Sequence, residues 1–200
     1  MATEATDLLD AYEKLLKSHG RQAWWPMKRR FRPSEWEVCV GAILTQNTNW
    51  RNVEKALDSL IKNKVVTPEA TLKTSRQRLE QLIRSSGFYK QKAERLKTLA
   101  RFVLSCGSFE KFRKVERSEL LKVKGIGPET CDSILLYACG RPYFVIDAYT
   151  RRFVRLLGIK EAKDYEALRA YFEKNLPHDL KLYKEFHALI VEWGKNNRSC

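Results

Sequence analysis

A glycine turn at residues 125–127 is the segment whose residue types best suit the binding of an anion. It reads Gly-Ile-Gly and is followed by Pro128, which is preset for the first position of a helix. A helix N-terminus offers N–H groups and the positive end of the helix dipole to a phosphate. Lys122 and Lys124 add positive charge beside the turn. An ordinary tight turn between two helices is the alternative, because glycines allow positive φ and close backbone approach.

Two common nucleotide sites are excluded by the surroundings of this turn. It follows a predicted helix rather than a strand, and it lacks the Gly-Lys-Ser/Thr ending of a P-loop. A helix-hairpin-helix is therefore the better interpretation.

Asp147 is the second candidate for chemistry. It follows the apolar run at 143–146 and precedes a predicted helix that carries Arg151 and Arg152. This position is typical of a helix N-cap, whose side-chain oxygen accepts a hydrogen bond from the first turn. The residue pattern alone therefore predicts a capping carboxylate.

The adjacent tryptophans Trp24 and Trp25 are a third candidate. Neighbouring residues point in different directions, so both cannot face one helical core. We expect at least one of them to line a cleft or a loop surface, and a plug packed between two lobes is the alternative. His187 is interpreted as a core or interface histidine.

The elements that must position these residues are helices. Apolar residues recur at helical spacing through nearly the whole chain. We expect helices at 8–16, 34–44, 50–61, 75–83, 89–104, 118–123, 128–139, 147–157, 165–172 and 180–193. Only 143–146 could pass for a strand, and one strand makes no sheet, so the predicted class is all-α.

The expected organisation is a single unit of two helical lobes. The central lobe covers about 35–140 and contains the hairpin at 118–139. The second lobe combines about 1–34 with 141–200. Connections between the predicted helices are short, and the sequence shows no internal repeat and no low-complexity linker.

The charge balance favours a polyanionic partner. The chain has 38 Lys and Arg against 24 Asp and Glu, a formal net charge of +14. Each cation that meets a phosphate releases condensed counterions, which favours nucleic acid. The alternative is a solvated basic surface. Membrane binding is disfavoured because the basic residues are spread along the chain instead of flanking an apolar anchor.

Location and redox state follow from what the sequence lacks. No apolar run approaches the roughly 20 residues that span a bilayer, and the first residues lack the apolar core of a signal peptide. We therefore expect a cytoplasmic, nucleoid-associated protein. The five cysteines are scattered and form no Cys-x-x-Cys pair, so neither a disulfide framework nor a zinc site is indicated.

The order of the hairpin and Asp147 resembles the helix-hairpin-helix family of DNA glycosylases, the endonuclease III relatives. In that family the hairpin precedes a segment like Val-Asp-Thr-His-x-x-Arg, and Asp147 matches its aspartate. The resemblance covers about residues 35–195. The segments at 24–26, 42–48, 86–92 and 124–129 look, within this family, most like bacterial 3-methyladenine DNA glycosylase III.

The resemblance implies an endonuclease III-like fold and an enzyme of base excision repair that flips a damaged base out of duplex DNA. Asp147 would be the catalytic residue. The base pocket would comprise Trp24, Trp25, Pro26, Trp50 and Glu129, where stacking on an aromatic ring holds the base. The DNA contacts would come from Gln46, Asn47, Lys122, Lys124, Gly125, Ile126, Gly127 and Thr130. Gln46 and Asn47 could also be plain helix C-caps.

The resemblance also suggests which chemistry is missing. Bifunctional relatives carry a lysine in the hairpin, which attacks the sugar and leads to strand cleavage. Glu129 occupies that position here, and a carboxylate cannot form an imine. Many relatives end in four cysteines that hold an iron–sulfur cluster, whereas Cys200 alone is insufficient. We therefore expect no cofactor and no lyase activity.

The expected function is a monofunctional, monomeric glycosylase that hydrolyses the N-glycosidic bond of alkylated purines such as 3-methyladenine in double-stranded DNA. The alternatives are a glycosylase for uracil, mismatched thymine or oxidised bases, and a non-catalytic DNA-binding module. The first shares the hairpin and Asp147 and differs in its pocket. The second would not depend on Asp147 for any reaction.

Overall fold

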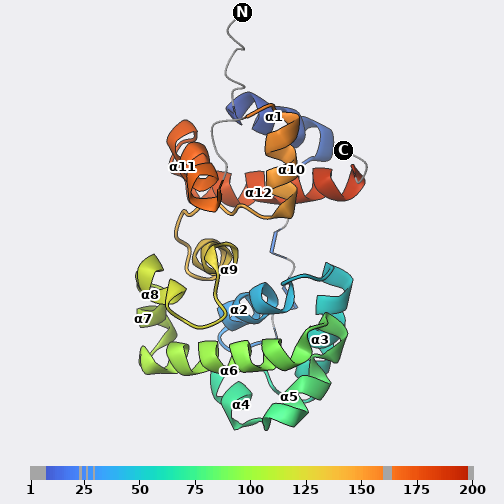
Figure 1. Cartoon of the computed structure of the whole chain (residues 1–200), viewed down its shortest axis with the longest axis vertical. Coiled ribbons are helices and arrows are strands. Elements are labelled where there is room, and N and C mark those ends of the chain that lie inside the picture. Colours follow the sequence, from blue (N-terminus) through green and yellow to red (C-terminus); the bar gives the residue numbers. More distant parts are fainter. Residues whose placement is uncertain (1–7, 23, 26, 29, 160–163, 198–200) are drawn as a thin grey trace, which may run out of the picture. The chain divides into compact units, whose positions relative to one another are not determined.

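The computed structural model describes residues 8–22, 24–25, 27–28, 30–159 and 164–197. The chain forms two compact units (Figure 1). The first combines Met1–Pro26 with Arg141–Cys200, and the second is Met27–Gly140. We call them the terminal unit and the central unit. The sequence predicts these divisions near residues 34 and 140.

The central unit is built around one buried helix. Its helices are α2 (Ser34–Leu44), α3 (Trp50–Lys62), α4 (Pro68–Lys73), α5 (Arg76–Leu82), η1 (Arg84–Ser86), α6 (Tyr89–Ser105), α7 (Phe109–Phe112), α8 (Arg117–Leu121) and α9 (Pro128–Ser133), and α9 continues into the π-helical turn η2 (Ile134–Ala138). Helix α2 is buried from Trp36 to Leu44 and packs against α6 and η2. Helix α6 lies between α2 on one side and α4 and α5 on the other (Figure 1).

The terminal unit contains α1 (Leu8–His19), α10 (Ala148–Leu156), α11 (Tyr165–Asn175) and α12 (Leu180–Asn196). Helix α12 packs against both α1 and α10. The core of the terminal unit is aromatic. Phe144 stacks on Phe172 with ring centroids 4.2 Å apart, and Phe186 contacts both rings. The apolar run at 143–146 thus enters this core as an extended segment and delivers the chain to α10.

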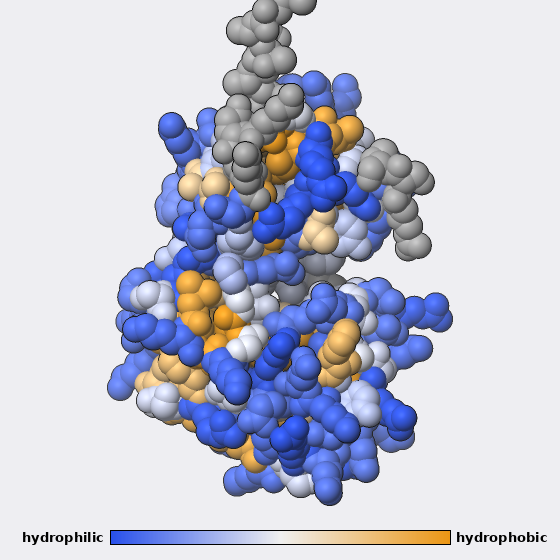
Figure 2. Space-filling model, viewed as in Figure 1, coloured by the Kyte–Doolittle hydropathy of each residue, from blue (hydrophilic) through white to orange (hydrophobic). Residues whose placement is uncertain are grey.

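The predicted all-α class is confirmed, and no strand occurs among the residues that the structure describes. The short helices α4 and α7 were not predicted, because one turn is too short to show a helical period. The helix predicted at 128–139 is α9 followed by η2. The face drawn in Figure 2 is mainly hydrophilic, as the high charge content requires.

Candidate active site and nucleic-acid interface

Asp147 is the N-cap of α10, as its sequence position predicts. Its Oδ1 accepts the Thr150 backbone N–H at 2.8 Å, and the Thr150 hydroxyl lies 3.0 Å from the same oxygen. Its Oδ2 lies 3.5 Å from Nε2 of His187. The Asp147 side chain keeps 17% of its surface exposed. It is therefore a carboxylate held at one oxygen and still open to an outside molecule.

The environment of Asp147 favours its charged form. Burial raises the pKa of this carboxyl group, but the polar contact with His187, the charge of that residue and the hydrogen-bond donors of Thr150 outweigh burial. The net effect lowers the pKa below the ordinary value of 3.8. The carboxylate thus stays ionised at neutral and mildly acidic pH. It can stabilise positive charge that develops nearby, and it is a weak base.

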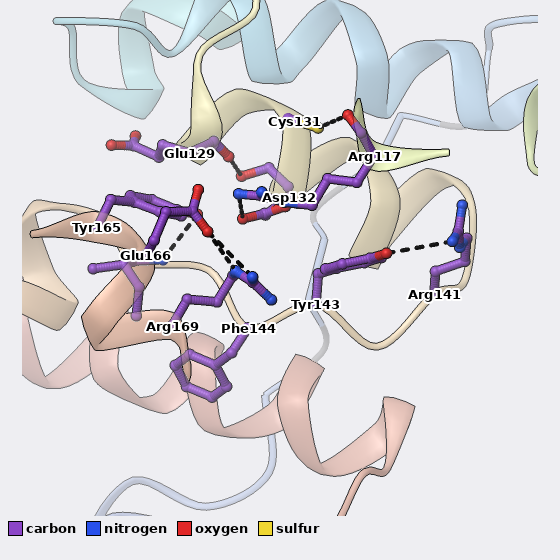
Figure 3. Close-up of polar contacts among 12 residues, drawn as sticks. Arg117, Glu129, Cys131, Asp132, Arg141, Tyr143, Phe144, Tyr165, Glu166 and Arg169 are labelled. Carbon is purple, nitrogen blue, oxygen red and sulfur yellow. Dashed lines mark hydrogen bonds and ion pairs between the residues drawn. The ribbon is translucent and has the colours of Figure 1, made fainter. Parts of the chain in front are cut away.

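The extended segment before Asp147 is pinned by polar contacts (Figure 3). Glu173 accepts the Phe144 backbone N–H at 3.0 Å and pairs with Arg169 at 2.5 Å. Arg169 also pairs with Glu166 at 3.1 Å. Phe144 is also packed in the aromatic core. The backbone that leads into α10 is therefore held in place, and this fixes the position of the Asp147 backbone.

The hairpin joins α8 to α9 in the central unit. Gly125 has a φ of +93° and Gly127 an ordinary φ of −88°. Pro128 is the first residue of α9, as predicted. Lys122 and Lys124 are exposed, whereas Ile126 is 5% exposed and its N–H donates to the Val123 carbonyl. Ile126 therefore anchors the turn in the unit, and the glycines and lysines form its outer surface.

The two helices of the hairpin are tied by an ion pair. Arg117 opens α8, and its guanidinium donates twice to the Asp132 carboxylate of α9, at 2.6 and 3.0 Å (Figure 3). The Asp132 side chain is fully buried, and that of Arg117 is 14% exposed. A two-point pair of this kind fixes orientation as well as distance. It holds the helices on either side of the turn in one geometry.

Gln46 is engaged by the hairpin. Its Nε2 donates to the Thr130 hydroxyl at 2.9 Å and to the Gly125 carbonyl at 3.3 Å. Its Oε1 accepts from the Arg95 guanidinium. Asn47, the next residue, is exposed with a φ of +51°. Of the two residues expected to enter DNA, Gln46 thus braces the hairpin in this structure and Asn47 points to solvent.

Phe88 is a candidate that sequence reasoning missed. It is 61% exposed, follows the positive-φ Gly87, and itself has a φ of +44°. A large apolar side chain held outward on a left-handed residue is unusual in a folded chain. The available signal was an aromatic residue directly after a glycine at the start of a basic helix. Apolar side chains of this kind insert between base steps in proteins that distort duplex DNA.

Lys92 connects the segment that leads to Asn47 with the segment that leads to Phe88. It is 1% exposed, and its ammonium group donates to the Leu44 carbonyl at 2.8 Å and to the Ser86 carbonyl at 2.6 Å. Leu44 is the last residue of α2 and Ser86 the last of η1. One buried cation therefore closes the two helix ends from which these turns depart.

Replacing Lys92 by methionine should lower the free energy of unfolding by about 1–3 kcal/mol, because two buried carbonyls lose their donor. Burial, and then Arg95, lowers the pKa of Lys92 from 10.5 to about 8. The folded chain therefore binds fewer protons than the unfolded chain between these values. The stability of the wild type relative to the variant should rise from about pH 8 to pH 10.5.

Chemical denaturation across this pH range measures the effect. Lys90→Met is the matched control, because Lys90 is exposed on the same helix. Equal stability curves for the Lys90 and Lys92 variants would contradict the role given to Lys92.

A basic depression lies beside the hairpin in the central unit. Its volume is about 450 Å³. Its lining contains four cations and one acid, Glu94; the cations are Arg76, Lys90, Arg95 and Lys124. Such a surface suits a phosphate chain.

The candidate pocket residues are divided between the two units. Trp24 and Trp25 are half-buried in the terminal unit, with ring centroids 6.0 Å apart in an edge-on arrangement. The Lys195 ammonium group lies 5.2 Å from the Trp24 ring centroid. Trp50, half-buried at the start of α3, and the exposed Glu129 belong to the central unit. Pro26 lies outside the described residues.

No metal centre is indicated by the part of the chain that the structure describes. There, no group of three or more His, Cys, Asp or Glu side chains is arranged to hold a metal ion. The described residues therefore offer no ligand set that fits an iron–sulfur cluster, and Cys200 lies outside them. None of the described helices is long and apolar enough to cross a bilayer.

The fold and the hairpin define a class of protein. The chain matches the profile of the HhH-GPD superfamily of base excision DNA repair proteins over residues 40–178. It belongs to this superfamily, and the predicted resemblance is confirmed. The chain is thus a helix-hairpin-helix DNA glycosylase of base excision repair, a hydrolase of N-glycosyl bonds.

Individual relatives agree with this assignment. A provisionally assigned DNA repair glycosylase of Methanocaldococcus jannaschii is 47% identical over 92% of this chain and 85% of its own. Endonuclease III of Thermotoga maritima is 31% identical over 79% of this chain and 72% of its own. The H. pylori 3-methyladenine DNA glycosylase bound to 1,N6-ethenoadenine superposes with a TM-score of 0.83 at 33% identity, covering 97% of this chain and 98% of that one.

Proposed function

We propose that this glycosylase hydrolyses the N-glycosidic bond of alkylated purines, such as 3-methyladenine, in double-stranded DNA and leaves an abasic site. The observation that carries the proposal is the ionised, N-capped Asp147 carboxylate. The likeness to the H. pylori enzyme, whose bound ligand is a modified adenine, supports the substrate class. The aromatic pair Trp24 and Trp25 supplies rings on which such a base can stack.

The chemistry assigned to Asp147 follows from its charge. The bond between C1′ and the base nitrogen breaks, and its electron pair leaves with the base. Positive charge then develops on the sugar, and the Asp147 carboxylate stabilises it. Water adds to C1′, and its proton passes through Asp147 to solvent. A weak base is sufficient, because water becomes acidic as it bonds to the cationic sugar.

The substrate class matches a site without a strong acid. A purine methylated at N3 or N7 carries positive charge and leaves as a neutral base, so it needs no proton donor, whereas the neutral ethenoadenine is a poorer leaving group and should be released more slowly. A cation is also attracted to an aromatic face. In the terminal unit Lys195 already lies over the Trp24 ring. We assign the stacking surface to this pair of rings, Trp24 and Trp25.

The grip on DNA is assigned to the central unit. The glycine turn and the first turn of α9 bind a phosphate, with Lys122 and Lys124 adding charge. Phe88 and Asn47 occupy the space that the flipped nucleotide leaves, which offsets part of the few kcal/mol that unstacking costs. Gln46 braces the turn from the protein side. These roles remain proposals for each residue.

The proposal includes the absence of lyase chemistry. Glu129 stands where bifunctional relatives have an attacking lysine, and a carboxylate cannot form a Schiff base. Borohydride treatment of the enzyme with abasic duplex DNA should therefore trap no covalent adduct. Endonuclease III is the positive control. A trapped adduct would contradict the predicted absence of lyase chemistry. Lysine variants would then identify the substitute nucleophile, because the adduct disappears when that lysine is removed.

The experiment that tests the function is a panel of duplexes, scored for base release by chromatography. The panel contains methylated DNA, ethenoadenine, uracil, a G·T mismatch and 8-oxoguanine. We expect release of 3-methyladenine and ethenoadenine alone. Release of uracil, thymine or 8-oxoguanine instead would overturn the alkylpurine assignment. Tight DNA binding without any release would identify a non-catalytic module.

Three further predictions accompany the function. We propose a monomer, because one chain supplies the hairpin, the carboxylate and the tryptophans, and sedimentation tests this. The absence of an iron–sulfur cluster remains a prediction, which iron analysis of the purified chain tests. A cytoplasmic, nucleoid-associated location also remains a prediction, which imaging of a tagged chain tests.

A further inference from the structure

The two oxygens of Asp147 have different surroundings in the terminal unit. Oδ1 is held by the Thr150 backbone N–H and lies against the Thr150 hydroxyl. Oδ2 lies 3.5 Å from Nε2 of His187. A contact of this length is electrostatic in this structure, and it can shorten to a hydrogen bond in a complex.

His187 is held firmly where it meets Asp147. It is 4% exposed and lies in the most buried stretch of α12, between Phe186 and Ala188. Helix α12 packs directly on α10, the helix that Asp147 caps. Gly194 of α12 lies against α10, because a Cβ added there would overlap the Tyr149 ring. The histidine therefore has little freedom to turn away from the carboxylate.

The placement of this imidazole has a consequence for the carboxylate. A capping hydrogen bond at one oxygen leaves the carboxyl group free to rotate about its bond to Cβ. A donor at the second oxygen removes that freedom and fixes the plane of the group. An imidazole N–H can supply this donor at Oδ2, while the exposed edge of the carboxylate stays open.

We infer that His187 is a positioning residue for Asp147, holding Oδ2 through Nε2 so that the carboxylate faces the sugar in one orientation. This inference rests on the proposed role of Asp147. His187 touches no substrate and takes part in no bond change. It also keeps the carboxylate charged, in agreement with the lowered pKa of Asp147.

The test compares three substitutions of His187 in the full chain. His187→Gln keeps an N–H donor at about the position of Nε2. In His187→Asn the side chain is too short for its amide to reach Oδ2 of Asp147, and His187→Leu removes the donor. Single-turnover base release should fall by about tenfold or more for Leu and Asn and by less than about threefold for Gln. Affinity for a duplex with a tetrahydrofuran abasic analogue should stay unchanged for all three.

The rescue by glutamine separates positioning from packing. If the leucine variant does not fold, the comparison of glutamine with asparagine decides, because both are polar. Equal rates for these two, or a rate for leucine equal to wild type, would overturn the inference. The proposed function fails separately, since an active Asp147→Asn variant or a wild type that releases no base refutes it whatever His187 does.

Discussion

Replacing Asp147 by asparagine is expected to slow single-turnover base release by about 10²–10⁴-fold. Asparagine caps a helix as well as aspartate, so α10 should keep its N-cap bond to Thr150. The neutral amide cannot stabilise positive charge on the sugar. The change therefore removes the charge and leaves the local structure intact. Release from an ethenoadenine duplex under enzyme excess measures the effect.

Asp164 provides the matched control. It caps α11 in the same way, with its Oδ1 accepting the Ala167 backbone N–H at 2.8 Å, and it is exposed. Asp164→Asn should therefore leave base release and the melting temperature unchanged. Affinity of the Asp147 variant for an abasic analogue should also be retained. Equal release by the Asp147 and Asp164 variants would remove Asp147 from the chemistry.

Gly127→Ala, which adds one methyl group, should weaken DNA binding without changing the free energy of unfolding. The φ of −88° suits alanine, and no protein atom lies within 4 Å of an added Cβ. The free energy of unfolding should therefore change by less than about 0.5 kcal/mol. If the turn meets a phosphate through its backbone, the methyl group occupies that space. We expect at least about a tenfold loss of affinity for the abasic duplex.

Gly125→Ala is the companion change, with the opposite signature. Its φ of +93° is strained for alanine, and a Cβ would overlap the Arg95 side chain. Arg95 in turn contacts Gln46, which braces the turn. Unfolding free energy should fall by about 1–3 kcal/mol. Normal binding by the Gly127 variant, together with an unchanged Gly125 variant, would contradict the proposed hairpin geometry.

Local rules account for the parts of the site that the sequence predicted. Asp147 before a helix and Pro128 after a glycine turn each carry a capping signal within a few residues. The structure has both helix starts where these signals put them. The run at 143–146 is also apolar as predicted, and Phe144, Val145 and Ile146 are buried in an extended segment, with no strand among the residues that the structure describes.

Contacts between distant segments could not be predicted in the same way. Gln46 meets Thr130, Lys92 meets Leu44, and His187 meets Asp147, across 84, 48 and 40 positions of sequence. Periodicity gives the buried face of a helix but not the polar atom that it meets. The outward placement of Phe88 depends on its left-handed backbone, which helical spacing does not reveal. The catalytic role proposed for Asp147 rests on the family resemblance and not on its capping pattern.

A crystal structure of the Asp147→Asn variant bound to a duplex containing ethenoadenine tests the central claim most directly. We predict a flipped ethenoadenine against the Trp24 and Trp25 pair, a phosphate at the turn of Gly127, and a side-chain oxygen of residue 147 within about 3.5 Å of C1′. A flipped nucleotide whose sugar lies far from residue 147 would contradict the account, as would a duplex bound on a surface that leaves the glycine turn in solvent.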